Sequence, residues 1–183
     1  MLIAKPITKT CDKKIFESVK NLYTTAFPKQ EQVALPFLIS RTKKAGVNFD
    51  AFYDEDEFVG LTYTISHKDI IYLWYLATAP GLRSKGYGSQ IMQYLYDAHP
   101  NKRIVLNLDI QDETAPDSEI RKRRKEFYIR NGYSSTGYKC LFNRNKLDVM
   151  YINGNVTFEE FASVFKNYFG VIISLFAKPK PYP

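Results

Sequence analysis

The chain has 183 residues, 45% of them hydrophobic and 25% charged, a balance typical of a soluble globular protein of one domain or two small ones. Its net charge of +7 suits a polyanion or an anionic cofactor and does not choose between them. No apolar run approaches the roughly 20 residues that cross a bilayer, and the amino terminus lacks a signal-peptide pattern. We therefore expect a cytoplasmic protein without a membrane-spanning helix.

Cysteines and histidines are scarce. Cys11 and Cys140 are too far apart in the sequence for a CxxC metal or redox motif, and they form no disulfide framework. The sequence has two histidines, His67 and His99, so it offers few ligands for a structural zinc ion and few candidates for the base of a Ser/His/Asp hydrolase. The sequence therefore predicts no metal cofactor.

The chain opens with a short strand and two helices. Residues 2–4 predict the strand, and apolar residues then recur at helical spacing from Ile15 to Ala26, before Pro28. A second helix is predicted at residues 36–46, because proline is favoured in the first helical turn and glycine follows helix ends.

Three strands are predicted at residues 47–53, 58–65 and 70–78, with turns between them. Apolar residues alternate with small or polar ones along the second strand, which indicates one buried face. The third strand is apolar at nearly every position, so we expect it to be central and covered on both faces. Together these strands predict an antiparallel meander.

A helix is predicted after the loop at residues 80–89, followed by a strand at residues 103–110 and a long helix at residues 116–131 that Gly132 ends. Strand, loop, helix and strand in this order form a parallel crossover unit. The sequence therefore predicts an α/β (α+β) fold. Its mixed central sheet has an antiparallel amino-terminal half and a parallel strand pair, with helices on both faces.

The loop at residues 80–89 joins a buried strand to the start of a helix. There, backbone N–H groups lack intrahelical partners and the helix dipole adds partial positive charge, so the main chain can hold an anion. Glycines let a phosphate approach closely. A Walker loop is excluded because Lys85 precedes Gly86, and a dinucleotide fingerprint is excluded because Ile91 stands three positions after Gly88.

The remaining spacing, R-x-x-G-x-G at Arg83, Gly86 and Gly88, resembles the pyrophosphate-binding signature of the GNAT superfamily of acyl-CoA-dependent N-acetyltransferases. A second pattern, FYIRNGY at residues 127–133, is similar to the one that ends a later helix in GNAT proteins. The resemblance covers roughly residues 1–150, which we predict to be an acetyl-CoA-binding N-acetyltransferase domain.

The resemblance implies direct attack of a primary amine on the thioester of acetyl-CoA, without a covalent enzyme intermediate. A lysine-type amine has a pKa of about 10.4, so the protein must help to remove its proton. By position, Tyr128 resembles the family's general acid, which protonates the departing CoA thiolate, and the alternative is a core tyrosine. A backbone N–H at residues 76–78 is implied to receive the charge of the thioester oxygen. The implied cofactor-binding residues are Leu76, Ala77, Thr78, Arg83, Ser84, Lys85, Gly86, Tyr87, Gly88 and Ser89.

The general base is left open. Several family members place a glutamate where this sequence has Tyr72, and a tyrosine cannot act as a base at neutral pH. Asp109, near the carboxyl end of the next predicted strand, matches a second family arrangement. The alternative bases are Glu113 and a water relay. Asp109 would then have a structural role or a surface position. Tyr72 is expected to line the amine site.

Residues 151–183 predict a carboxy-terminal extension packed on the same domain. A capping box at Thr157 and Glu160 starts a helix whose aromatic residues share one face until Gly170 ends it. This face could pack on its own domain, form the interface of a homodimer or line the substrate site. Residues 171–176 could form a last strand, and residues 178–183 a frayed tail.

The predicted function is an N-acetyltransferase for a small-molecule or peptide amine, with acetyl-CoA as co-substrate. The acceptor cannot be read from the motifs, because the fold and cofactor signature are shared by enzymes for many amines. A catalytically weak acyl-CoA-binding or regulatory module is the main alternative, suggested by Tyr72. A nucleic-acid-binding protein ranks third, on the net positive charge.

Overall fold

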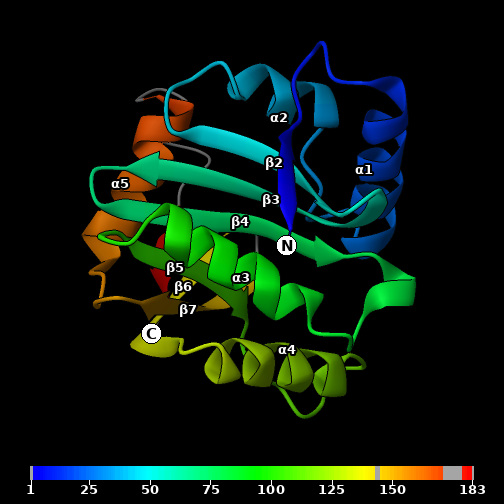
Figure 1. Cartoon of the computed structure of the whole chain (residues 1–183). Coiled ribbons are helices and arrows are strands. Elements are labelled where there is room, and N and C mark those ends of the chain that lie inside the picture. The colour runs from blue at the N-terminus through cyan, green and yellow to red at the C-terminus, as the bar shows by residue number, and fades with distance from the viewer. Residues whose placement is uncertain (1, 143–144, 171–178, 183) are drawn as a thin grey trace. The chain divides into compact units, whose positions relative to one another are not determined.

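The computed structural model describes residues 2–142, 145–170 and 179–182. The chain divides into two compact units. Unit 1 contains Met1–Ile65 and Leu73–Pro100, and unit 2 contains Ser66–Tyr72 and Asn101–Pro183. Figure 1 labels the helices and strands of both units.

The elements confirm the predicted mixed α/β class. Unit 1 contains β1 (Ile3–Pro6), α1 (Lys13–Ala26), α2 (Leu35–Arg41), β2 (Val47–Asp54), most of β3 (Glu57–His67), the end of β4 (Ile70–Thr78), a 3₁₀ turn (Pro80–Leu82) and α3 (Tyr87–Ala98). Unit 2 contains the start of β4, then β5 (Arg103–Asp109), α4 (Ser118–Arg130), β6 (Ser134–Phe142), β7 (Asn145–Ile152), α5 (Phe158–Phe169) and β8 (Lys180–Tyr182). Among the described residues, the strands hydrogen-bond in the order β1-β2-β3-β4-β5-β7-β6-β8.

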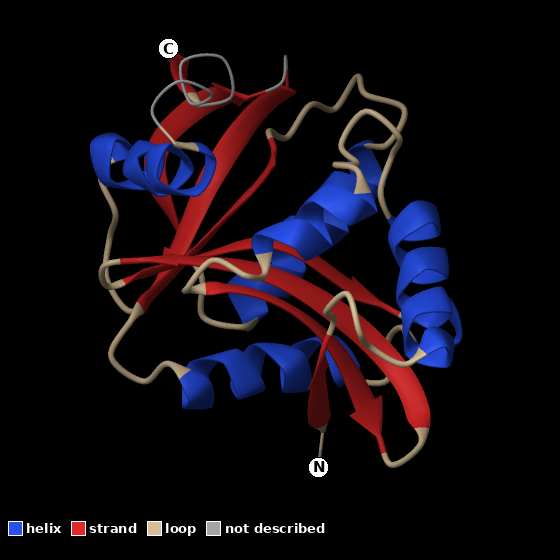
Figure 2. Cartoon of the chain, turned by 90° about the horizontal axis from the view of Figure 1, so that it is seen from above, coloured by secondary structure: helices blue, strands red, loops and turns tan. Residues whose placement is uncertain are grey.

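In unit 1, β1 pairs antiparallel with β2, and β2 pairs antiparallel with β3, as the predicted meander requires of the second pair. Helices α1 and α2 cover one face of these strands and α3 covers the other (Figures 1 and 2). On the first face, Tyr63 Oη donates a hydrogen bond to Leu38 O in α2 at 3.2 Å. On the other face, the ring of Phe52 in β2 contacts that of Tyr94 in α3, with 5.2 Å between centroids.

Helix α1 begins where the sequence supplies a cap. Asp12 Oδ1 accepts hydrogen bonds from the backbone N–H groups of Lys14 and Ile15, at 2.7 and 3.3 Å. Helix α2 is shorter than predicted, because it ends at Arg41 and the chain then turns before β2. Among the helices of the described residues, none is long and apolar enough to cross a membrane.

Unit 2 contains the parallel strand pair. Residues 70–72 of β4 pair in parallel with residues 103–105 of β5, as the crossover unit predicts. The hairpin of β6 and β7 has no counterpart in the sequence predictions, and β7 lies between β5 and β6. Helix α4 packs on one face of these strands, where Lys125 reaches Asp148 of β7. Helix α5 packs on the other face, where Phe165 contacts Phe142 of β6.

The capping box at the start of α5 is confirmed. Thr157 Oγ1 accepts from Glu160 N at 3.2 Å, and Glu160 Oε2 accepts from Thr157 N at 2.9 Å. Four residues of the aromatic face are buried, namely Phe161, Val164, Phe165 and Tyr168. Two of them, Phe161 and Phe165, pack on the ring of Tyr72 in the same unit.

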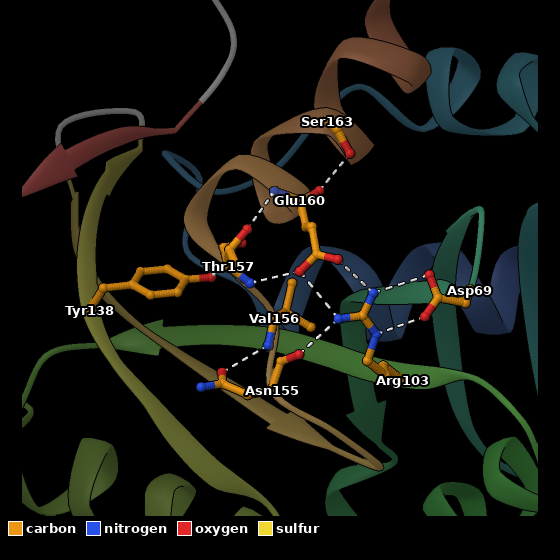
Figure 3. A network of polar contacts seen from close by, with 8 residues as sticks. All are labelled: Asp69, Arg103, Tyr138, Asn155, Val156, Thr157, Glu160 and Ser163. Atoms are coloured by element: carbon orange, nitrogen blue, oxygen red, sulfur yellow. Dashed lines mark hydrogen bonds and ion pairs between the residues drawn. The ribbon is translucent and has the colours of Figure 1, made fainter.

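A network around Arg103 ties the start of α5 to strand β5 (Figure 3). The Arg103 guanidinium donates to both carboxylate oxygens of Asp69, at 2.7 and 3.1 Å. It also donates to Glu160 Oε1 and to Asn155 O, each at 2.8 Å. These ion pairs hold the pKa of both carboxyl groups below their usual values.

The predicted frayed tail is wrong for residues 180–182. They form β8, which pairs antiparallel with residues 139–141 of β6. Backbone pairing holds this segment. The Lys146 ammonium also contacts it, 4.9 Å from the centroid of the Tyr182 ring. The strand predicted at residues 171–176 lies outside the described residues.

Candidate functional site

The predicted site residues divide between the two units. Residues 76–78 and 83–89 belong to unit 1, and Asp109, Glu113 and Tyr128 belong to unit 2.

The loop predicted to bind the cofactor, here called the cofactor loop, comprises residues 83–89 of unit 1. Helix α3 begins in this loop without a side-chain cap. Gly86 is the N-cap residue, with φ of +86°, and no side chain caps it among the described residues. The first backbone hydrogen bond of the helix runs from Gln90 N to Gly86 O at 3.1 Å. The preceding N–H groups have no intrahelical acceptor, which is the arrangement that holds an anion.

The left-handed conformation at Gly86 explains the first glycine of the motif. A side chain is strained at this φ whatever space surrounds it. Ser84, two residues earlier, also has positive φ, at +62°. Arg83 and Lys85 are exposed beside this turn, so their charges are available to an anion.

Two side chains anchor the loop to unit 1. Leu82 is buried in a cluster with Phe52, Val59 and Ile91. Tyr87 Oη donates to Asp54 Oδ2 at 2.9 Å, and this hydrogen bond raises the pKa of the phenol. Because the Tyr87 hydroxyl is engaged with β2, its backbone N–H is the group that the loop can offer to a ligand.

Tyr128 of unit 2 lies in the last turn of α4 and is 7% exposed. Its ring meets that of Tyr133 edge-on, with 5.6 Å between centroids. Gly132 has φ of +87°, and the chain turns back so that Tyr133 N donates to Tyr128 O at 3.0 Å. The second motif is therefore a glycine-ended helix that fixes the position of Tyr128.

Asp109 is the last residue of β5 and is half-buried, opposite Leu147 of β7. Glu113 is exposed in the loop that follows. The structure places Asp109 at the carboxyl end of the strand, as predicted, and leaves its role as base a prediction.

Tyr72 differs from its expected place. It is 1% exposed, and its ring packs against Phe161 and Phe165 of α5, at centroid distances of 5.4 and 5.0 Å. Its hydroxyl hydrogen-bonds Asn107 Oδ1, and burial raises its pKa well above the usual value. The expectation that Tyr72 lines an open amine site is therefore wrong, because α5 covers it.

The sequence predictions missed a buried carboxylate. Asp148 of β7 is 8% exposed and accepts from Lys125 Nζ at 2.8 Å and from Ser135 Oγ at 2.7 Å. Lys125 stands one helical turn before Tyr128, so this contact fixes α4 on the sheet near that residue. The available signal was a single aspartate within the apolar run LDVMYI.

Residues 48–135 match the sequence model of the acetyltransferase (GNAT) domain. A comparison with curated protein sequences finds no match. No group of three or more His, Cys, Asp or Glu side chains in the described part of the chain could hold a metal ion.

Solved structures share the fold. One is a protein from Bacteroides thetaiotaomicron assigned to the GNAT acetyltransferase family, with a TM-score of 0.73 and 23% identity over 94% of this chain and 98% of that one. An aminoglycoside 6'-N-acetyltransferase in complex with coenzyme A has a TM-score of 0.65 and 17% identity, covering 82% of this chain and 96% of that one. The ribosomal-protein-S18-alanine N-acetyltransferase of Escherichia coli has a TM-score of 0.62 and 11% identity, covering 86% and 96%. The match over residues 48–135 confirms the resemblance to GNAT proteins, and the solved structures share the fold.

Proposed function

We propose that this protein is an acetyl-CoA-dependent N-acetyltransferase that acts on a primary amine. The observation that carries the proposal is the uncapped amino terminus of α3, which follows β4 after the turn at Pro80–Leu82 and begins at a left-handed glycine. Such a helix start binds a pyrophosphate through backbone N–H groups. Two exposed basic residues, Arg83 and Lys85, stand beside it.

Each predicted residue has a chemical role in this proposal. The N–H groups of residues 84–89 hold the pyrophosphate, and residues 76–78 pair with the pantetheine amides as an added strand would. The amine nitrogen attacks the thioester carbon, and its proton passes to Asp109 directly or through water, with Glu113 as the alternative. As the C–S bond breaks, Tyr128 gives its proton to the departing thiolate.

The acceptor is proposed to be a small molecule or a peptide. Among proteins of this fold, one acts on an aminoglycoside and another on the alanine of a ribosomal protein, so the fold does not select the acceptor. Other points remain predictions from the sequence. They are the division into an acetyltransferase domain at residues 1–150 and an extension at residues 151–183, a homodimer, and a cytoplasmic location.

A catalytically weak acyl-CoA-binding module is the second candidate, because Tyr72 replaces a base and is buried under α5. A panel of amines with thiol detection separates the two, since CoA release reports turnover with any acceptor. We expect release above the rate without amine for at least one class of acceptor. Acetyl-CoA binding with no release across amino acids, polyamines, aminoglycosides and peptides would favour the binding module instead.

A further inference from the structure

Gly60 in β3 lies where a side chain has no room. A methyl group there would stand 2.5 Å from Ala77 O, 2.9 Å from Ile91 Cδ1 and 3.4 Å from Thr78 Cα. The first distance is shorter than any real Cβ contact, and the atom that it meets belongs to the backbone. Gly60 therefore allows the end of β4 to approach β3 in a way that no other residue type would.

The close contact also fixes the direction of one peptide group. Among the atoms of Ala77 and Thr78, the carbonyl oxygen of Ala77 is the nearest to the missing methyl, and Thr78 Cα is next. The carbonyl carbon thus lies farther away than Thr78 Cα, so the C=O bond points at Gly60. In a trans peptide the following N–H points the opposite way, and the described residues contain no cis peptide. The N–H of Thr78 is therefore directed away from Gly60.

Hydrogen bonds that follow the Ala77–Thr78 peptide hold the chain in this orientation. After Thr78, Ala79 N donates to Val59 O at 2.9 Å, which returns the chain to β3. Leu82 N then donates to Ala79 O at 2.9 Å and starts the turn that leads to the cofactor loop. Ile91 of α3, whose Cδ1 approaches Gly60, is fully buried and packs this region from one face.

We infer that Gly60 is a positioning residue: by leaving room for the Ala77 carbonyl, it aims the Thr78 N–H at the oxygen of the acetyl-CoA thioester. This inference rests on the proposed function. A preorganised N–H donor stabilises the charge that develops on that oxygen only if its direction is fixed before reaction. A methyl at Gly60 would turn or displace the Ala77–Thr78 peptide, because the backbone oxygen cannot leave by a change of rotamer.

The test compares Gly60→Ala with two matched controls. Gly81→Ala adds the same methyl to the nearby turn, where nothing lies within 4 Å. Ile91→Val removes the Cδ1 atom that the Gly60 methyl would meet, and the double variant Gly60→Ala/Ile91→Val leaves the clash with the carbonyl alone. The double variant also serves if Gly60→Ala does not fold.

Two readouts separate positioning from stability. The first is steady-state kinetics with the acceptor that the amine panel identifies. We expect kcat to fall on the order of 10²-fold in both Gly60 variants, with a KM for acetyl-CoA near the parental value and parental kcat in both controls. The second is infrared spectroscopy of bound acetyl-CoA carrying a ¹³C-labelled thioester carbonyl. A hydrogen bond lowers this stretching frequency in the parent, and the Gly60 variants should return it toward the value of the free cofactor.

The outcomes distinguish this inference from the proposed function. A parent that binds acetyl-CoA with no shift of the carbonyl band would overturn the role of Thr78, and so would a folded Gly60→Ala with parental kcat and a parental band. A parent that neither binds acetyl-CoA nor releases CoA would overturn the proposed function and this inference with it.

Discussion

Gly86 and Gly88 carry the cofactor proposal at the scale of single residues. Replacing either with valine should weaken acetyl-CoA binding, because a side chain at Gly86 is forced into a left-handed conformation that costs about 1–2 kcal/mol and either side chain obstructs the phosphate. Isothermal calorimetry with acetyl-CoA measures the loss. Gly81→Val, in the adjacent turn, should bind like the parent. Unchanged affinity in both loop variants would remove the pyrophosphate from this loop.

Tyr128 has a matched neighbour that separates chemistry from packing. Tyr128→Phe keeps the buried ring and removes only the hydroxyl, so we expect a stable protein whose kcat is lower by about 10²- to 10⁴-fold. Tyr133→Phe removes a hydroxyl from the ring that Tyr128 contacts and should turn over near the parental rate. Equal kcat in the two variants would make Tyr128 a packing residue.

The proposed role of Asp109 as general base predicts that its replacement changes the pH profile of kcat/KM. If it accepts the amine proton, Asp109→Asn loses most activity near neutral pH, and the loss shrinks as alkali supplies neutral amine without help. Glu113→Gln, in the exposed loop, should follow the parental profile. Profiles from pH 6 to 10 with one acceptor test both. If Asp109→Asn runs parallel to the parent while Glu113→Gln does not, the base is Glu113.

At the scale of elements, the Arg103 network joins β5, the β3–β4 turn and α5 in unit 2 (Figure 3). Arg103→Met should lower the free energy of unfolding at pH 7 by about 1–2 kcal/mol, allowing for partial exposure of both carboxylates. The pKa values of Asp69 and Glu160 are lowered in the folded protein. Their contribution is thus present above the unfolded pKa values of about 4 and is lost as pH falls through the lower folded values.

Urea unfolding of the parent and Arg103→Met at pH 7 and at pH 2.5 to 4 measures this change. The difference between the two proteins should narrow on acidification. Lys20→Met breaks an exposed i,i+3 pair with Glu17 and should change stability by less than about 1 kcal/mol at either pH. A pH-independent difference for Arg103→Met would show that packing of its side chain, rather than its ion pairs, stabilises unit 2.

For the whole molecule, binding of acetyl-CoA should raise the melting temperature. A ligand at 100 times its Kd stabilises the folded state by about 2.7 kcal/mol when it binds only that state. Scanning calorimetry with acetyl-CoA should show this shift, and Gly86→Val should abolish most of it. A double-stranded oligonucleotide at equal concentration should give none. A shift with the oligonucleotide that falls steeply with salt would support nucleic-acid binding instead.

The sequence predicts well what depends on neighbouring residues. The cap of α5, the antiparallel pairing of β2 and β3 and the glycine that ends α4 follow from local spacing, as does the loop before α3. Three other features depend on contacts between segments that are far apart in the sequence. They are the position of β7 between β5 and β6, the pairing of β8, and the burial of Tyr72 under α5. For the same reason Asp148 was missed. The motifs point to a candidate loop for the cofactor and leave the general base open.

Among the residues that the structure describes, the two outermost strands share a composition that bears on self-association. β1 reads IAKP and β8 reads KPY, so each is short and carries both a lysine and a proline. Proline lacks the N–H that a further strand would need, and a charged lysine opposes the docking of another backbone. Neither edge is therefore a template for adding strands from a second chain, which protects the sheet from edge-to-edge aggregation. The two edges that the described strands present are therefore poor surfaces for a dimer interface.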